Sequence, residues 1–555
     1  MATVQSLVRP AVSVLGKFGA LPGWVFTRVV AYLIALVSPP APVLPPYHQP
    51  KSPQWDTLLR TMVIALIVFI GLIYGFLIAI FPLFLYTYLA APIAVVLLLT
   101  IWALPESDTF PHNAIIKLFF AASSTVCLWP NYLAVAIPGL PWITLMRLST
   151  IPLTICVLIS LSVSPKFRRD MSQWFESAPW LLRLMLAFIA IEILTLPMSQ
   201  SPFSSLNRLF ILQIEWTMMF FLSAYIFSVP GRATLWVKMF CSFVAFLAVS
   251  SLIEYRMGHV PWAGHLPSFL VVQSDIVDKI LVGGARAASG KYRVQSIFTT
   301  SLSFAEILGL STPFFLHFLM TSRTRIMQAA LAVYLCFSFF VIITTDSRLG
   351  IIGFFASVLL YLFFGSFKRW RSRQDSIFSP AIVLSYPMIF MLFMALTLVW
   401  RRLNVMVWGG GAQQSSTDGR AEQWTMGMVK FWQWPFGYGQ SQGGVVVGWV
   451  DLAGNMSLDS YYLSILIEFG IIGFIAYFGM LLLAASEAFI AGVSSKDKEI
   501  DLLMPLGIMI IVFIIGKGVL SQTDNHTLFF VMLGMLVALL HRSKSARKIS
   551  SPSDD

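Results

Sequence analysis

Long runs of apolar residues, separated by short polar segments, repeat along most of this chain. Each run has about the 20 residues that an α-helix needs to cross a lipid bilayer. The runs lack the alternation of polar and apolar positions that is typical of membrane β-strands. Because lipid offers no partners for open backbone groups, each run should be helical. The predicted spans are residues 61–81, 83–103, 115–135, 140–163, 180–197, 209–229, 234–253, 297–319, 326–344, 349–366, 380–400, 461–489, 503–521 and 527–541.

The composition agrees with this pattern. Of 555 residues, 57% are hydrophobic and 11% are charged, whereas about 25% are charged in a typical soluble domain. The cysteines all lie in apolar runs and form no Cys-x-x-Cys pair, so neither a disulfide nor a metal site is expected. The sequence predicts an all-α polytopic membrane protein with about 12–14 transmembrane helices.

The net charge of +12 would suggest nucleic acid as a partner in a soluble protein. Here the positive charges lie largely in short loops and in the C-terminal tail. These segments are residues 164–173, 322–325, 368–374, 494–499 and 541–548. Alternation of the spans places all five on one side, which the positive-inside rule makes cytoplasmic. Both termini are then cytoplasmic, nucleic acid is not expected, and the acidic loop 104–114 falls on the same side.

Two long segments, residues 254–296 and 401–459, lie on the opposite, outer side. Loops longer than about 12–15 residues are usually functional or disordered, and the tryptophans, glycines and arginines of these two segments are unlike disorder. The chemistry should therefore lie at the outer face.

Arginines recur at this outer face, with Arg348 in a tight turn, Arg420 in the second long segment and Arg293 just before a span, while Arg208 and Arg147 also fall near outer span ends. A guanidinium group binds phosphate oxygens with two parallel hydrogen bonds. Together these arginines favour a lipid-linked phosphate or pyrophosphate as ligand. The alternative for each is a pair with a nearby acid, such as Asp346 or Asp418.

Carboxyl groups also occur where spans meet the outer face. Ionisable residues inside membranes are costly and usually functional. Those within the predicted apolar runs or at their ends are Glu192, Glu215, Glu254, Glu306, Glu468 and Lys517. Asp459 at a span entrance, Glu468 inside that span and His526 in an outer turn are candidates for a general base that activates a sugar hydroxyl. The alternatives are a structural pair with an arginine for Glu468 and simple solvation for His526, while Gly470 and Gly473 are expected to allow close helix packing.

Four stretches carry a resemblance to a known family, and they occur in the family's order. They are KYRVQSIFTTSLSFAEIL (291–308), TTDSRLG (344–350), DGRAEQW followed by WPFGYG (418–439), and Ser460 followed after nine residues by Gly-x-x-Gly-Phe. Over residues 140–541 the chain resembles the bacterial O-antigen ligase and Wzy-type polysaccharide polymerase superfamily. Ligases of this group have a histidine where this chain has Asp459, and that departure favours a polymerase.

The resemblance implies a GT-C-like membrane glycosyltransferase with long periplasmic loops. It would transfer a glycan from undecaprenyl pyrophosphate, with inversion and without a metal or cofactor, to a sugar hydroxyl of another lipid-linked glycan. The catalytic candidates are then Asp459, Glu468 and His526, and the pyrophosphate would bind Arg348, Arg420 and Arg293. The expected function is an exopolysaccharide or O-antigen polymerase. The alternatives are an O-antigen ligase acting on lipid A-core and a flippase for lipid-linked oligosaccharides.

The expected organisation has three parts. Residues 1–55 form a cytoplasmic or interfacial segment with a proline-rich linker, residues 56–541 the transmembrane glycosyltransferase domain, and residues 542–555 a basic tail. The resemblance implies the bacterial inner membrane as location, and a chain-length regulator and a flippase of the same pathway as further partners. No nucleotide-binding motif and no Asp-x-Asp pattern occurs in the outer loops.

Overall fold

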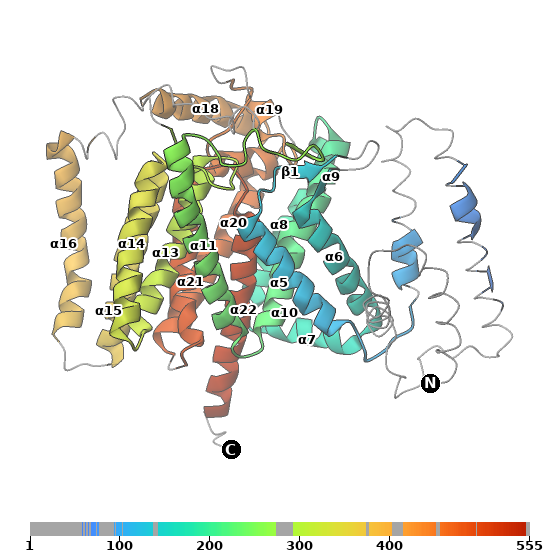
Figure 1. Ribbon diagram of the computed structural model, residues 1–555, viewed down its shortest axis with the longest axis horizontal. Coiled ribbons are helices and arrows are strands. Elements are labelled where there is room, and N and C mark those ends of the chain that lie inside the picture. The colour runs from blue at the N-terminus through green and yellow to red at the C-terminus, as the bar shows by residue number, and fades with distance from the viewer. Residues whose placement is uncertain are drawn as a thin grey trace. The chain divides into compact units, whose positions relative to one another are not determined.

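The computed structural model describes residues 104–136, 142–272, 292–372, 377–401, 414–450, 456–495 and 497–550, with isolated positions between 58 and 102 and residue 404. The N-terminal segment 1–55 lies outside these residues, as do most of the first two predicted spans. Within the described part the chain is overwhelmingly helical (Figure 1).

Eleven helical stretches among the described residues are long and apolar enough to cross a membrane. The helices in them are α6 (Leu145–Val163), α8 (Pro179–Leu194) with η2 (Leu196–Met198), α9 (Pro202–Leu212), η3 (Gln213–Met218), α10 (Met219–Phe227), α11 (Arg232–Met257), α13 (Ser301–Thr321), α14 (Arg325–Thr344), α15 (Arg348–Ser372), α16 (Phe378–Val399), α20 (Tyr461–Val493), η5 (Ile500–Leu502), α21 (Leu503–Lys517) and α22 (His526–Ser550). The predicted span at 115–135 corresponds to the shorter apolar helix α5 (His112–Leu128). The prediction of an all-α, multi-pass membrane protein is confirmed.

The chain forms two compact units, residues 1–117 with 155–169, and residues 118–154 with 170–555. In the first unit, Arg168 at the start of α7 (Pro165–Glu176) lies 2.6 Å from the carboxylate of Glu106. The same guanidinium donates to the carbonyls of Leu161 and Ser162, each at 2.8 Å. The acidic loop 104–114 is therefore paired with the basic loop 164–173, as their predicted position on one side requires.

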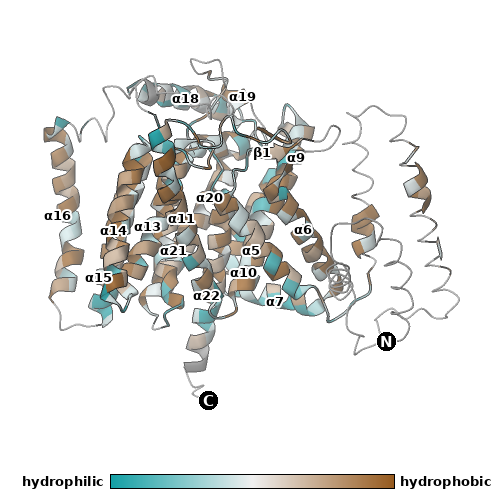
Figure 2. Cartoon of the chain, in the orientation of Figure 1, coloured by the Kyte–Doolittle hydropathy of each residue, from teal (hydrophilic) through white to brown (hydrophobic). Residues whose placement is uncertain are grey.

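In the second unit, three helices are largely buried and two are largely exposed. In the most apolar window of each stretch, the buried share is 89% for α22 and 78% for both α13 and α21 (with η5), but 22% for α14 and 6% for α16. Figure 2 shows hydrophobic residues along α14 and α16. Apolar helices whose outer faces lack protein neighbours fit a lipid environment, where the bilayer covers those faces.

One end of the second unit gathers the predicted cytoplasmic loops. Lys368 at the end of α15 lies 2.6 Å from Asp501, and Arg542 on α22 lies 2.6 Å from Glu499. Lys544 donates at 2.7 Å to the backbone carbonyl of the residue that follows α7. Loops far apart in sequence thus meet at the same end, as their common sidedness predicts.

The other end of this unit carries the outer segments (Figure 1). A small antiparallel sheet there has the order β2 (Ile143–Thr144), β1 (Leu133–Val135), β3 (Leu270–Val272), with Ala134 opposite both Thr144 and Val271. Helix α18 (Gln414–Gln433) and the short helix α19 (Gly443–Val447) pack against α20 at this end. The segment between α18 and α19 enters the helical layer and positions the candidate site.

Candidate functional site

Helix α20 is interrupted at Gly470, where the backbone has φ +68° and ψ −172°. The loop WPFGYG that follows α18 fills the interruption. The N–H of Tyr438 donates to the carbonyl of Ile467 at 2.9 Å, and the N–H of Ile471 donates to the carbonyl of Pro435 at 3.2 Å. Interrupted helices are tolerated within a membrane when other parts of the protein bind the freed backbone groups, and they often mark binding sites.

The structure describes the surroundings of the two glycines predicted to allow helix packing. A Cβ on Gly473 would clash with Cβ of Phe469 in the same helix, and Ile191 of α8 would lie 3.4 Å from it, an ordinary contact. Gly470 instead has a positive φ that an L side chain rarely adopts. Its backbone interrupts the helix, a role that the spacing of two glycines does not indicate.

The interruption turns Glu468 toward the inserted loop. The N–H of Gly439 donates to its backbone carbonyl at 2.9 Å. Its carboxyl group accepts hydrogen bonds from the N–H of Ser441 (2.9 Å), the N–H of Gly443 (3.3 Å) and the hydroxyl of Ser464 (3.1 Å). The hydrogen-bond donors that hold Glu468 are therefore backbone amides and a serine, rather than the arginine considered in the sequence analysis.

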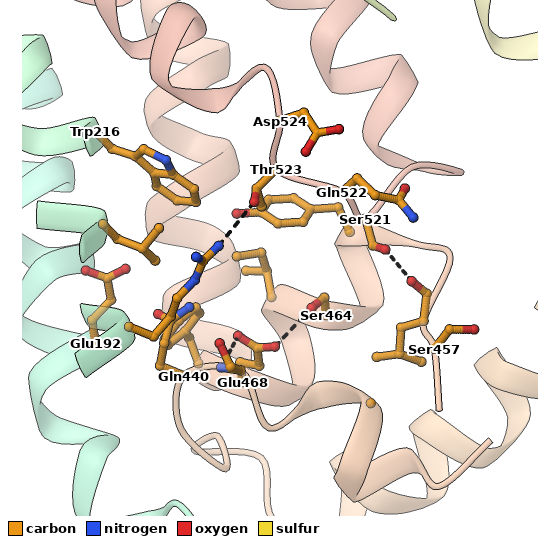
Figure 3. Close-up of a pocket in the computed structure, with 18 of the residues that line it drawn as sticks. Glu192, Trp216, Gln440, Ser457, Ser464, Glu468, Ser521, Gln522, Thr523 and Asp524 are labelled. Carbon is orange, nitrogen blue, oxygen red and sulfur yellow. Dashed lines mark hydrogen bonds between the residues drawn. The ribbon is translucent and has the colours of Figure 1, made fainter. Parts of the chain in front are cut away.

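Glu468 lines a cavity of about 410 Å³ in the second unit (Figure 3). The walls come from α8, α9, η3, α20, the loop 440–444, the residues before α20 and the turn 521–524 between α21 and α22. The titratable side chains that line it are Glu192, Arg208, Glu468, Asp524 and Tyr461. Cavities with mostly apolar walls and a few converging polar groups are the usual form of ligand sites.

From the sequence, Glu192 was identified only as an intramembrane charge and Arg208 only as an arginine near an outer span end, while Asp524 was not identified. Each is held by a neighbour. Arg208 donates to the hydroxyl of Thr523 at 3.2 Å. Glu192 accepts from the side-chain amide of Gln213, the first residue of the π-helical turn η3, at 2.8 Å. Asp524 accepts from the hydroxyl and N–H of a threonine just before α13. A charged residue near the outer end of an apolar run is the signal that all three share.

Asp459 lies beside this cavity, one residue before the N-cap of α20. Its carboxylate oxygen lies 3.4 Å from Nε of Arg420 on α18. Its backbone N–H donates at 2.9 Å to the amide oxygen of Gln423, one turn further along α18. The preceding residue, Leu458, lines the cavity and accepts a hydrogen bond from the hydroxyl of Ser521. The predicted Asp459 and Arg420 are thus brought together at the cavity's edge.

Arg293, another predicted arginine, is bound to the turn that precedes Arg348. Nε of Arg293 donates at 2.9 Å to the carbonyl of Thr345, in the turn that leads to Arg348 at the start of α15. The buried carboxyl of Glu254 holds the segment that follows Arg293, because it accepts from the N–H groups of Gln295 and its neighbour at 2.8 Å. Neither arginine lines the 410 Å³ cavity.

His526 is the first residue of α22 and is fully buried. Its ring stacks on Trp216, with centroids 4.6 Å apart, and meets Tyr461 edge-on at 4.9 Å. Both aromatic residues line the cavity, so the imidazole lies behind its wall. Simple solvation, the alternative considered for His526, is therefore wrong.

A buried ion pair braces the turn that carries Asp524. Nζ of Lys517 lies 2.9 Å from the carboxylate of Glu306, and both side chains are almost fully buried. Asn525 donates to the same carboxylate at 2.8 Å, and Lys517 donates to the carbonyl of Gln522 at 3.0 Å. These two intramembrane charges satisfy each other, and they fix the turn 521–525.

Comparison with known proteins assigns part of this chain to a family. The model of the O-antigen ligase family, Wzy_C, matches residues 331–478. The matched segment contains Arg348, Arg420, Asp459 and Glu468. It also contains Gly470, where α20 is interrupted, and the loop 434–439 that fills the interruption. No curated protein matches the sequence. The resemblance found in the sequence is supported by this match, and residues 331–478 of this multi-pass membrane protein are similar to the O-antigen ligase family.

Proposed function

We propose that this protein is a polysaccharide polymerase of the bacterial inner membrane. It transfers a glycan from undecaprenyl pyrophosphate to a sugar hydroxyl of a second lipid-linked glycan at the periplasmic face. The observation that carries the proposal is the pair Asp459–Arg420 at the entrance of α20, next to a cavity lined by Glu468. The O-antigen ligase domain across the same residues supports glycan transfer as the reaction class.

In the proposed reaction a carboxylate takes the proton of the acceptor hydroxyl, and the hydroxyl oxygen attacks the anomeric carbon of the donor. The bond from that carbon to the pyrophosphate oxygen breaks, and the electron pair leaves with the lipid pyrophosphate. Arginine side chains offset the charge that develops on this leaving group. Arg420 contacts Asp459 beside the cavity. Arg293 and Arg348 would bind the lipid-linked donor from their own side of the outer face.

Two carboxylates are placed to act as the base. Glu468 lines the cavity, but its oxygens already accept three hydrogen bonds. Asp459 has 37% of its side chain exposed, and one of its carboxylate oxygens lies 3.4 Å from Nε of Arg420. A carboxylate can serve as a general base in place of a histidine. We therefore propose Asp459 as the base and Glu468 as a group that positions the acceptor.

A flippase for lipid-linked oligosaccharides is the second candidate, because interrupted helices also occur at the substrate sites of transporters. The interruption of α20 at Gly470 is the observation that favours it. An O-antigen ligase remains the alternative within the family, although the histidine of ligases is replaced by Asp459 in this chain.

Reconstitution in liposomes with a defined lipid-pyrophosphate-linked repeat unit distinguishes these functions. A polymerase lengthens the glycan without nucleotide triphosphate. A flippase moves the intact donor across the bilayer and forms no glycosidic bond, and a ligase forms one only when lipid A-core is supplied. Either of the last two outcomes would overturn the proposal.

Variants then test the residues. We expect Arg420→Ala, Arg348→Ala and Asp459→Asn each to abolish elongation in a folded, inserted protein. Arg325→Ala is the matched control, because that exposed arginine lies at the start of α14, on the predicted cytoplasmic side. Normal product length in any of the three variants would remove that residue from the site.

A further inference from the structure

One polar atom of the cavity lacks a partner. The side-chain oxygen of Gln440 has no hydrogen bond from any described residue, although only 7% of the residue is exposed. Gln440 lines the cavity, as Figure 3 shows, and its backbone carbonyl is fixed by the hydroxyl of Ser205 at 2.7 Å. Buried polar groups nearly always have a partner. A buried, unpaired amide oxygen on a residue that lines a cavity favours a ligand that donates a hydrogen bond.

The remaining polar lining is also rich in acceptors. Glu192, Glu468 and Asp524 bring carboxyl groups to the cavity, and the described protein donors satisfy only part of them. Arg208 is the one lysine or arginine among the lining residues, and it already donates to a threonine hydroxyl and lies within electrostatic reach of Glu468. Such a lining suits hydroxyl and amide groups, which donate. It does not suit phosphate or carboxylate groups, which when ionised only accept.

The size and the walls of the cavity agree with a sugar ring. Its volume of about 410 Å³ is near the lower end of the roughly 300–1,000 Å³ that is usual for small-molecule sites. Phe188, Trp216, Tyr461 and Phe469 form apolar parts of the wall. A pyranose ring has apolar C–H faces and a rim of hydroxyl groups, so it can use both kinds of surface.

We propose that this cavity is a subsite for one uncharged sugar residue of the acceptor, and that the amide oxygen of Gln440 accepts a hydrogen bond from one of its hydroxyl or amide groups. The proposal rests on the proposed function, because it takes Glu468 as the group beside the acceptor hydroxyl. The cavity discriminates against uronic acids, since a carboxylate there would face an acceptor-rich lining in a medium of low dielectric constant. The subsite thus determines which sugar the enzyme extends.

Binding of simple glycosides to the full-length protein in lipid nanodiscs tests this subsite. Ligand-observed NMR titrations use the methyl glycosides of glucose, galactose, mannose and N-acetylglucosamine, and methyl glucuronide as the acidic probe. We expect at least one neutral glycoside to bind, and methyl glucuronide to bind at least about tenfold more weakly than the best neutral probe. Equal or tighter binding of methyl glucuronide, or no binding of any probe, would overturn the proposal.

Variants at the unpaired amide make the test specific. Gln440→Leu should weaken binding of the best neutral probe by about tenfold, because it removes an acceptor from a buried site. Gln440→Glu keeps an acceptor oxygen, so it should retain binding of the neutral probe and lower binding of methyl glucuronide further. Gln328→Leu on α14 is the control, since that amide donates to the carbonyl of Ser322 on the predicted cytoplasmic side. If the folded Gln440→Leu protein binds the neutral probe as the wild type does, Gln440 is not part of the subsite. If Gln440→Leu does not fold, loss of neutral-probe binding in Gln440→Glu overturns the proposal.

These titrations need no lipid-linked donor, so their outcome is independent of the outcome of the polymerase assay. Normal elongation together with absent glycoside binding would overturn the subsite alone. Normal glycoside binding together with absent elongation would overturn the proposed function, and the cavity would then be a sugar site of a flippase or a ligase.

Discussion

Substitution of Gly470 by alanine tests whether the interruption of α20 matters. The backbone at this position, with φ +68° and ψ −172°, lies in a region that is essentially restricted to glycine. A Cβ there would lie 2.6 Å from the carbonyl carbon of Phe436 and closer still to the carbonyl oxygen of Pro435. The alanine must therefore either strain the backbone or expel the inserted loop.

The two routes give similar magnitudes. Retaining the interruption costs about 1–3 kcal/mol of backbone strain, and the clash with the loop adds to it. Expelling the loop gives up three loop-to-helix backbone hydrogen bonds at about 1 kcal/mol each, and it also removes the two backbone donors from the carboxyl group of Glu468. We expect Gly470→Ala to lower the free energy of unfolding by about 3–6 kcal/mol, out of the roughly 5–15 kcal/mol typical of folded proteins.

Thermal unfolding in detergent and elongation in liposomes are the two measurements. Gly479→Ala is the matched control in the same helix, because the nearest atom to its added Cβ, on Leu184, lies 4.0 Å away in ordinary contact. The control should melt at or slightly above the wild-type temperature and elongate normally. If Gly470→Ala also melted and elongated like the wild type, the interruption would not be needed for stability or for the site.

Three further predictions concern single contacts. Lys517→Met leaves the carboxylate of Glu306 buried without its ion pair, so it should destabilise the protein by about 3–5 kcal/mol in the same melting assay. The double variant Lys517→Met with Glu306→Leu should recover most of that loss. A single variant as stable as the wild type would contradict this prediction. Gln423→Leu removes the acceptor for the N–H of Asp459, and a resulting misplacement of about 1 Å should lower kcat by about 100-fold with little change in KM; an effect on KM alone would instead assign Gln423 to binding. Burial by itself would raise the pKa of Glu499, but hydrogen bonds from the backbone of Gly231 and from Arg542 outweigh it and lower the pKa below its usual value. The stabilising contribution of Glu499 is therefore present above the unfolded-state pKa of 4.5 and is lost as the pH falls through the folded-state pKa. The melting temperatures of the wild type and Glu499→Gln should differ at about pH 7 and converge in acid. A difference that stays constant with pH would refute the assignment of this stabilisation to the charge of Glu499.

The sequence predicted the spans well because each is a local property of about 20 consecutive residues. It also predicted that Asp459 and Arg420 lie on the same side of the membrane, and in the structure Nε of Arg420 lies 3.4 Å from the carboxylate of Asp459. Their contact depends on α18 lying against the start of α20, and no local pattern encodes that arrangement.

The cavity was beyond prediction for a related physical reason. Arg208, Glu192 and Asp524 come from three different parts of the chain, and only packing brings them together. Their signal in the sequence was a charge within or near an apolar run, which equally marks structural pairs such as Glu306 with Lys517. Spacing alone cannot separate a side chain that faces a cavity from one that faces a buried partner.

The loop that enters the interruption of α20 has a practical consequence for building chimeric enzymes. Residues 434–443 and 464–473 exchange backbone hydrogen bonds. Gly437 in the first segment and Gly470 in the second each lie so close to the backbone of the other segment that there is no room for a side chain. A chimera that takes one of these segments from a relative and keeps the other combines two segments whose side chains and backbones are not complementary. These two segments, separated by about 20 residues of chain, should be exchanged together as one unit.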